Sequence, residues 1–187
     1  RGRRAARVRD HDGMMPARLT VVRHAEASCD GVCYGRADVS VKLSPEAALR
    51  QVTWPAVATV WSSPSPRCRD LAAAVAAQQR ASLRVDERLY EMDFGAWEGR
   101  AWRDISEDEL TPWMSDWQNA APPGGETTSQ LTARVAAWHE ELAAPPHRHL
   151  LVAHAGVVRA LWVVHEEMMW PDAMERAVPH LEPIELR

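Results

Sequence analysis

The sequence predicts an α/β fold: a three-layer α/β/α sandwich with a largely parallel central sheet. Three short apolar runs, each ending in polar residues, have the composition of buried strands. Helical features follow the two later runs, and this repeated order of strand, loop and helix is typical of a layered parallel sheet. The 187 residues are enough for one domain, and the balance of 46% hydrophobic and 26% charged residues is that of a globular protein.

The chain begins with a basic stretch, residues 1–15, that contains almost nothing to bury. We expect it to be a disordered extension before a single domain over residues 16–187. Met14 and Met15 are both plausible starts, in which case the basic segment is not native. An arm that binds nucleic acid is the alternative. The net charge of −4 gives the chain no general attraction to nucleic acid, so we expect no such partner.

The predicted strands cover residues 19–22, 57–61 and 150–153. Arg23 and His24 follow the first strand, Ser62 and Ser63 follow the second, and His154 follows the third. Sheets of this kind place their sites beyond the carboxyl ends of the strands. We therefore expect these polar side chains to meet at one edge of the sheet.

Two helices have clear start signals. Ser65 and Pro66 suit the N-cap and first position of a helix that runs to Gln79. Thr127 and Gln130 fit a capping box for a second helix. A third helix, after residues 150–153, is predicted from periodicity alone. The apolar stripes of these last two helices are Leu131, Val135, Trp138 and Leu142, and Val157, Leu161, Val164 and Met168.

The segment 91–123 is rich in tryptophan and acidic residues and has no clear strand. We interpret it as an inserted cap, or a helical excursion, that lies over the site. Trp113 and Trp117 are one helical turn apart, a spacing that more often indicates core packing. The alternative is that tryptophans here stack on an aromatic group of a substrate. After Trp170 the sequence gives no assignment.

Four segments carry residues that suit phosphate chemistry. Arg23-His24 follows the first strand, and His154 follows the third. Arg67 lies in the first turn of a helix, where free backbone N–H groups and the helix dipole favour an anion. Glu91 begins the run Glu-Met-Asp-Phe-Gly-Ala-Trp-Glu-Gly. Each segment alone is a weak signal.

Taken in this order, the four segments resemble the histidine phosphatase superfamily, whose fold is also called phosphoglycerate-mutase-like. The resemblance runs from about Leu19 to Leu161. Within the superfamily, the runs 31–36, 91–99 and 124–126 look most like α-ribazole phosphatases of cobalamin biosynthesis. The resemblance implies an enzyme that hydrolyses a phosphomonoester through phosphohistidine, with α-ribazole 5′-phosphate as substrate and with no metal or other cofactor.

The resemblance also implies the role of each central residue. His24 is the nucleophile, Arg23 and Arg67 hold the phosphoryl oxygens, His154 donates a further hydrogen bond, and Glu91 protonates the leaving group. The residue types suit these roles, because a phosphate dianion calls for a neutral nucleophile and for cations around its oxygens.

Two further residues, Tyr34 and Gly35, are expected to contact the substrate. The assignment of Glu91 has competitors among nearby acids, each of which is otherwise a solvated surface charge. These acids are Glu26, Asp93 and Glu98.

Three cysteines are too few for a disulfide framework, and a reducing cytoplasm is the simpler interpretation. Cys29 and Cys33 are four apart, but the spacing fits few zinc motifs and no second pair follows. No apolar run is long enough to span a bilayer and no leader is recognisable, so we expect a cytoplasmic protein with no membrane partner. The expected partner is a small phosphorylated substrate, and the sequence leaves the oligomeric state open, a homodimer included.

Two alternatives remain open. One is a different reaction on the same site, either that of a phosphoglycerate mutase or that of a broad-specificity sugar or protein phosphatase. Mutases of the superfamily tend to be longer, so the short chain favours hydrolysis. The other is a non-catalytic phosphate-binding module. Such a module would be expected to lack one of the five central residues, and none is lost.

Overall fold

The computed structural model describes residues 18–142 and 148–186. The predicted basic extension, residues 1–15, lies outside the described residues and stays a prediction. The sheet has five strands in the order β3-β2-β4-β1-β5. Four of them run parallel, and β5 pairs with β1 in the antiparallel direction. The strands are β1 (Arg18–Arg23), β2 (Thr59–Ser62), β3 (Ser82–Val85), β4 (Arg148–Ala153) and β5 (Pro183–Glu185).

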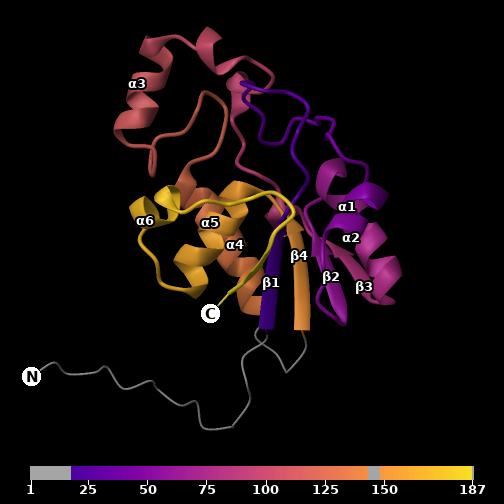
Figure 1. Cartoon of the computed structure of the whole chain (residues 1–187). Coiled ribbons are helices and arrows are strands. Elements are labelled where there is room, and N and C mark those ends of the chain that lie inside the picture. Colours follow the sequence, from indigo (N-terminus) through magenta and orange to yellow (C-terminus); the bar gives the residue numbers. More distant parts are fainter. Residues whose placement is uncertain (1–17, 143–147, 187) are drawn as a thin grey trace, which may run out of the picture.

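Helices cover both faces of this sheet, as the sequence predicts. In Figure 1, α1 and α2 lie on one side, and α4, α5 and α6 lie on the other. Within the described part of the chain the helices are α1 (Pro45–Gln51), α2 (Pro66–Gln79), α3 (Glu107–Ser115), α4 (Thr128–Glu141), α5 (Ala155–His165) and α6 (Trp170–Glu175), with short 3-10 turns at Glu87–Leu89, Gly95–Trp97 and Trp102–Asp104. The three-layer α/β/α fold is therefore confirmed.

The central strands are apolar along their length because both faces are covered. Val21 and Leu151 belong to the core that α4 and α5 build. Their neighbours Val22 and Val152 belong to the core under α1 and α2. Successive side chains of a strand point to opposite faces, so each buried strand contributes side chains to both cores.

The helix starts follow their sequence signals. Ser65 is the N-cap residue of α2 and Pro66 its first residue. Thr127 and Gln130 form the predicted capping box of α4, in which each side chain accepts a hydrogen bond from the other's backbone N–H. One expectation was wrong: Met168 lies beyond α5, which ends at His165. The backbone turns away at Glu167, whose φ is 54°, yet Met168 still packs against the same core.

The segment 91–123 stands beyond the carboxyl ends of the strands (Figure 1). It consists of α3, which begins with a capping box at Ser106 and Glu109, and of turns around it. Trp97 and Ile105 of this segment form a small core together with Cys33, which lies outside it. We refer to residues 91–123 as the cap. No helix among residues 18–142 and 148–186 combines the length and the apolar character needed to cross a bilayer.

Candidate active site

The pairing of β1 with β4 brings two histidines together at the carboxyl edge of the sheet. Arg23 is the partner of Ala153 in the parallel register, and the backbone N–H of His24 donates to the carbonyl of Ala153 at 3.0 Å. His24 and His154 are the next residues of their chains. Their ring centroids are 5.2 Å apart, with the rings edge to face.

His24 is held as a neutral imidazole with one free nitrogen. Its Nδ1 lies 2.7 Å from the carbonyl oxygen of Ala25. A carbonyl oxygen only accepts, so Nδ1 carries the proton and Nε2 carries the lone pair. Burial lowers the pKa of His24 to about 3, and the charges of Arg67 and Arg23 act in the same direction. His24 is therefore uncharged at neutral pH, as the predicted role of nucleophile requires.

His154 is fully buried, and both of its ring nitrogens have partners. Its Nδ1 lies 3.3 Å from Nη2 of Arg67, and its Nε2 lies 2.8 Å from the hydroxyl of Ser63. A guanidinium only donates, so Nδ1 accepts and Nε2–H donates to Ser63. Burial, with the nearby His24 and Arg67, holds the pKa of His154 well below its usual value. Direct donation to a phosphoryl oxygen would require one of these contacts to be exchanged, so this role stays a prediction.

Arg67 extends from the first turn of α2 and is almost completely buried. Its Nη1 donates to the carbonyl of Ala37 at 2.8 Å, and its Nη2 donates to that of Gly35. The ring of Tyr34 lies against the guanidinium, 5.4 Å from its carbon. Loop 34–37 thus touches the cation that was predicted to bind phosphate.

Two guanidinium nitrogens at this edge are buried without a hydrogen-bond partner among the described residues. They are Nε of Arg23 and Nε of Arg67. Arg23 is fixed by a bond from its Nη1 to the carbonyl of Val178, 2.9 Å long. A buried donor without an acceptor is costly. Two such donors beside His24 are suited to an anion.

Loop 34–37 is held from its other side by Glu98. The backbone N–H groups of Gly35, Arg36 and Ala37 each donate to its carboxylate at 2.9 Å. A Cβ on Gly35 would stand 1.8 Å from the carbonyl oxygen of Met92, so only glycine fits. Glu98 is a loop anchor. Both backbone groups of Gly35 are engaged within the protein, and its contact with substrate stays a prediction.

Glu91 lies beside the first turn of α5, close to His154. Its carboxylate accepts from the N–H groups of Met92 and Gly156, each at 3.0 Å. Tyr34 lies within electrostatic reach of Arg23, Arg67 and Glu91 at once, although burial is the main reason that its pKa is raised. Tyr34, the predicted substrate contact, therefore lies near both predicted phosphate-binding arginines and near the predicted proton donor.

The other candidate acids have structural partners. Asp93 accepts from the N–H of Gly95 at 2.8 Å. Glu26 is exposed and pairs with Lys42 at 2.7 Å. Among the four acids considered, only Glu91 lies against α5 beside His154.

A third histidine lies at this edge, and no sequence pattern predicts it. His180 lies in the segment before β5, where no strand or helix was assigned. Its Nδ1 is 2.7 Å from the carbonyl oxygen of His24, and the two rings are 5.6 Å apart. An isolated bridge joins its backbone to Arg23. The C-terminal segment therefore fixes the end of β1.

An apolar cavity of about 540 Å³ lies between the cap and helices α4 to α6. Glu91 and Gly156 form part of its wall, so it adjoins the predicted proton donor. The rings of Trp117 and Trp170 meet edge to face, 5.8 Å apart, and join the cap to α6. The other aromatic and apolar residues of its wall include Phe94, Trp113, Leu131, Pro171 and Met174.

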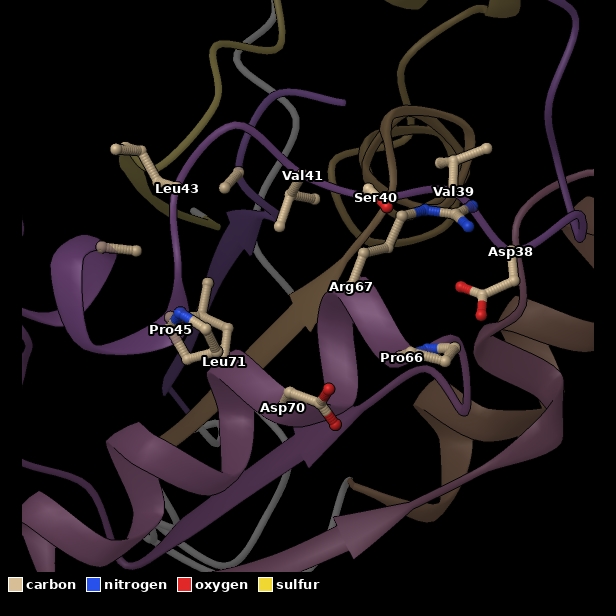
Figure 2. Close-up of a pocket in the computed structure, with 12 residues that line it drawn as sticks. Asp38, Val39, Ser40, Val41, Leu43, Pro45, Pro66, Arg67, Asp70 and Leu71 are labelled. Atoms are coloured by element: carbon tan, nitrogen blue, oxygen red, sulfur yellow. The ribbon is translucent and has the colours of Figure 1, made fainter. Parts of the chain in front are cut away.

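A second hollow, of about 260 Å³, lies beside Arg67 (Figure 2). Figure 2 shows Arg67 projecting from α2 toward the loop that carries Val39 and Ser40. Asp38 and Asp70 contribute carboxylates to this hollow. Their negative charges make this hollow unfavourable for a phosphate dianion.

The chain is similar to known phosphatases over most of its length. It is 29% identical to a protein of Hydrogenobacter thermophilus named as a candidate phosphoserine phosphatase, over 86% of each chain. It is 28% identical to the adenosylcobalamin/α-ribazole phosphatase of Escherichia coli, over 77% of this chain and 76% of that protein. The crystal structure of the α-ribazole phosphatase from Shigella flexneri matches with a TM-score of 0.78 at 25% identity, over 90% of this chain and 89% of that one.

Residues 19–180 match the histidine phosphatase superfamily, branch 1. The match covers strands β1 to β4 apart from Arg18, the residues His24, His154 and His180, and the cap, and it ends before β5. Its end coincides with His180, the residue that bonds to the carbonyl of His24. The chain therefore belongs to the histidine phosphatase superfamily, branch 1, and is a phosphatase that acts on a small phosphorylated substrate.

Proposed function

We propose that the protein hydrolyses phosphomonoesters through a phosphohistidine formed on His24, and that its preferred substrate is α-ribazole 5′-phosphate. The observation that carries the chemistry is a buried, neutral imidazole beside two arginines, each with an unpartnered Nε–H group. A neutral nucleophile can approach a dianion without repulsion, and the guanidinium groups supply the attraction.

In the first step, Nε2 of His24 attacks phosphorus and the bond from phosphorus to the ester oxygen breaks. Arg23 and Arg67 hold the non-bridging oxygens. Glu91, in its carboxylic acid form, gives its proton to the departing oxygen, because an alkoxide is a poor leaving group. The ring gains positive charge as the N–P bond forms. The Nδ1–H bond to the carbonyl of Ala25 stabilises that charge.

In the second step, the carboxylate of Glu91 takes a proton from water, and the water oxygen forms a bond to phosphorus. The N–P bond breaks, inorganic phosphate leaves, and the neutral imidazole of His24 returns. One acid therefore serves both half-reactions. Its position against Gly156 places it next to the nucleophile's neighbour, His154.

The cavity beside Glu91 supports an aromatic leaving group. Its wall is mostly apolar and includes the rings of Phe94, Trp113, Trp117 and Trp170. Aromatic side chains bind flat apolar groups by offset or edge-to-face packing. The benzimidazole of α-ribazole is such a group, and α-ribazole phosphatases are among the proteins that this chain resembles.

Phosphoserine is the second candidate, because the relative from Hydrogenobacter thermophilus is named for it. Its leaving group is a serine with an ammonium and a carboxylate. Moving these charges into an apolar cavity costs free energy unless each finds a partner. Apart from Arg159, Glu91 and Glu175 the wall offers few charged partners, so its mostly apolar surface favours the aromatic substrate.

A comparison of kcat/KM for α-ribazole 5′-phosphate, phosphoserine, 3-phosphoglycerate and nucleotides tests this proposal. We expect α-ribazole 5′-phosphate to have the highest value and to quench tryptophan fluorescence on binding. A higher value for phosphoserine would contradict the proposed substrate. The mutase alternative predicts transfer to a second acceptor that depends on a bisphosphate primer, whereas we expect phosphate release without one.

A further inference from the structure

Arg159 is a half-buried cation in the wall of the apolar cavity, and the chemistry proposed above does not use it. It lies on α5, between Gly156 and the end of the helix. Its Nε donates to the carbonyl of Ala173 in α6 at 3.2 Å. Its partial burial lowers its pKa.

No carboxylate among the described residues forms an ion pair with Arg159. Glu91 is near enough to stabilise its charge, but the oxygens of Glu91 accept from two backbone N–H groups. Glu175 also lines the cavity without bonding to Arg159. The terminal nitrogens of Arg159 are not among the buried polar atoms of the described residues that lack a partner, so they are open to the cavity that Arg159 lines. An acceptor on a bound ligand could take the place of water there.

The position of Arg159 relative to Glu91 is set by α5. Gly156, which donates to Glu91, and Arg159 are three residues apart and so share one face of the helix. Three residues of α-helix rise about 4.5 Å. A substrate with its ester oxygen at Glu91 would therefore place Arg159 next to atoms a few bonds further along its leaving group.

We propose that Arg159 is a specificity-determining residue whose terminal guanidinium nitrogens bind an oxygen acceptor on the leaving group, while the aromatic wall holds its apolar part. The proposal rests on the proposed function, because it assumes that the leaving group occupies this cavity. A planar fork of N–H donors suits two neighbouring oxygens, either those of a vicinal diol, as in a ribose, or those of a carboxylate. The substrate class is thus a phosphomonoester with such an oxygen pair near the ester.

The test compares Arg159→Met and Arg159→Lys with the parent on three substrates. Benzyl phosphate has an aromatic leaving group without an acceptor, α-ribazole 5′-phosphate adds a diol, and phosphoserine adds a carboxylate. We expect Arg159→Met to lower kcat/KM about tenfold or more for at least one acceptor-bearing substrate, mainly through KM, and Arg159→Lys to restore part of the loss. Turnover of benzyl phosphate should stay within about twofold. Arg103→Met, at an exposed arginine of the cap, is the matched control and should change nothing.

Each outcome supports or overturns the proposed role of Arg159. A loss confined to α-ribazole 5′-phosphate identifies the diol, and a loss confined to phosphoserine identifies the carboxylate. Equal losses on all three substrates would show that Arg159 only tethers α6 to α5, and no loss on any would show that it does not contact the leaving group. Either result overturns the proposal. If the parent prefers phosphoserine to α-ribazole 5′-phosphate, the proposed substrate is wrong. The role of Arg159 is still tested separately, by the loss of kcat/KM on the acceptor-bearing substrates relative to the loss on benzyl phosphate.

Discussion

Gly156→Ala is expected to disable the proposed proton donor without disturbing the fold. A Cβ on Gly156 would stand 2.2 Å from Oε1 of Glu91 and 3.2 Å from its Cδ. An ordinary contact needs more than about 3 Å, so the carboxylate must move away by about 1 Å. The displaced atom is the far end of a flexible side chain. Alanine is also a better helix former than glycine, by up to about 1 kcal/mol, so we expect the melting temperature to stay the same or to rise.

The effect should instead appear in catalysis. A misplacement of about 1 Å at a catalytic group costs about 100-fold in rate. The loss should be largest where protonation of the leaving oxygen matters most. Benzyl phosphate releases a basic alkoxide, whereas p-nitrophenyl phosphate releases a stable phenolate. We therefore expect the phosphorylation step to slow about 100-fold with the former and only a few-fold with the latter.

Rapid-quench measurement of the first turnover separates this step from dephosphorylation, which also uses Glu91. Glu91→Gln serves as the reference, and the double variant should be no slower than Glu91→Gln alone, because both changes act on one group. Equal slowing of both substrates in Gly156→Ala would show that the substitution perturbs the phosphate-binding residues. An unchanged rate with benzyl phosphate would show that Glu91 is not the acid.

Three further predictions concern stability and the loop over Arg67. Burial lowers the pKa of His24 to about 3 and that of His154 well below its usual value, so the unfolded chain binds protons first and stability declines as the pH falls below about 6.5. For His24 alone, the loss in the free energy of unfolding at pH 5 is about 2 kcal/mol. A melting temperature that is constant from pH 7 to pH 5 would contradict this prediction. Glu98→Ala removes the acceptor of four backbone N–H groups, those of Gly35, Arg36, Ala37 and Phe94. Urea denaturation should therefore show a loss of about 1–3 kcal/mol, and KM should rise. Unchanged values of both would refute its role as the loop anchor. Gly35→Ala would place a Cβ 1.8 Å from the backbone oxygen of Met92, which cannot rotate away as a side chain could. We therefore expect the free energy of unfolding to fall by about 3 kcal/mol or more. Near-parental stability would mean that loop 34–37 is not held as described.

The centre of the site could be predicted from the sequence because it depends on strand ends. Apolar runs fix where β1 and β4 lie, and a parallel register then brings the residues that follow them together. The two histidines, His24 and His154, could therefore be placed side by side without knowing any side-chain contact. The start of α2 could be read from Ser65 and Pro66 for the same reason, since capping is local.

The two strands that the sequence analysis missed, β3 and β5, carry no clear burial pattern. All four residues of β3 are exposed, so its sequence does not alternate. In β5 the first residue is a proline and two of its three residues are exposed. His180, which precedes β5, could therefore not be assigned to the edge of the sheet.

The cavity beside Glu91 depends on how the cap packs against α4 to α6, and periodicity does not report that. Trp97 is buried in the small core beside the cap. Trp113 packs against that core and also lines the cavity, and Trp117 lines the cavity. The spacing of the tryptophans alone did not separate these cases. The position of Arg159 in the cavity wall could not be predicted for the same reason, since an arginine on a helix is usually solvated.

The proposed mechanism depends on transfer of the phosphoryl group to the imidazole of His24. Rapid acid-free quenching of a reaction with radiolabelled phosphomonoester, followed by peptide mapping, tests it directly. We expect close to one labelled phosphate per active protein in the first turnover, stable in base, labile in acid and carried by the peptide that contains His24. A His24→Ala variant that turns over substrate at the parent's rate, or a label on any other residue, would contradict the account.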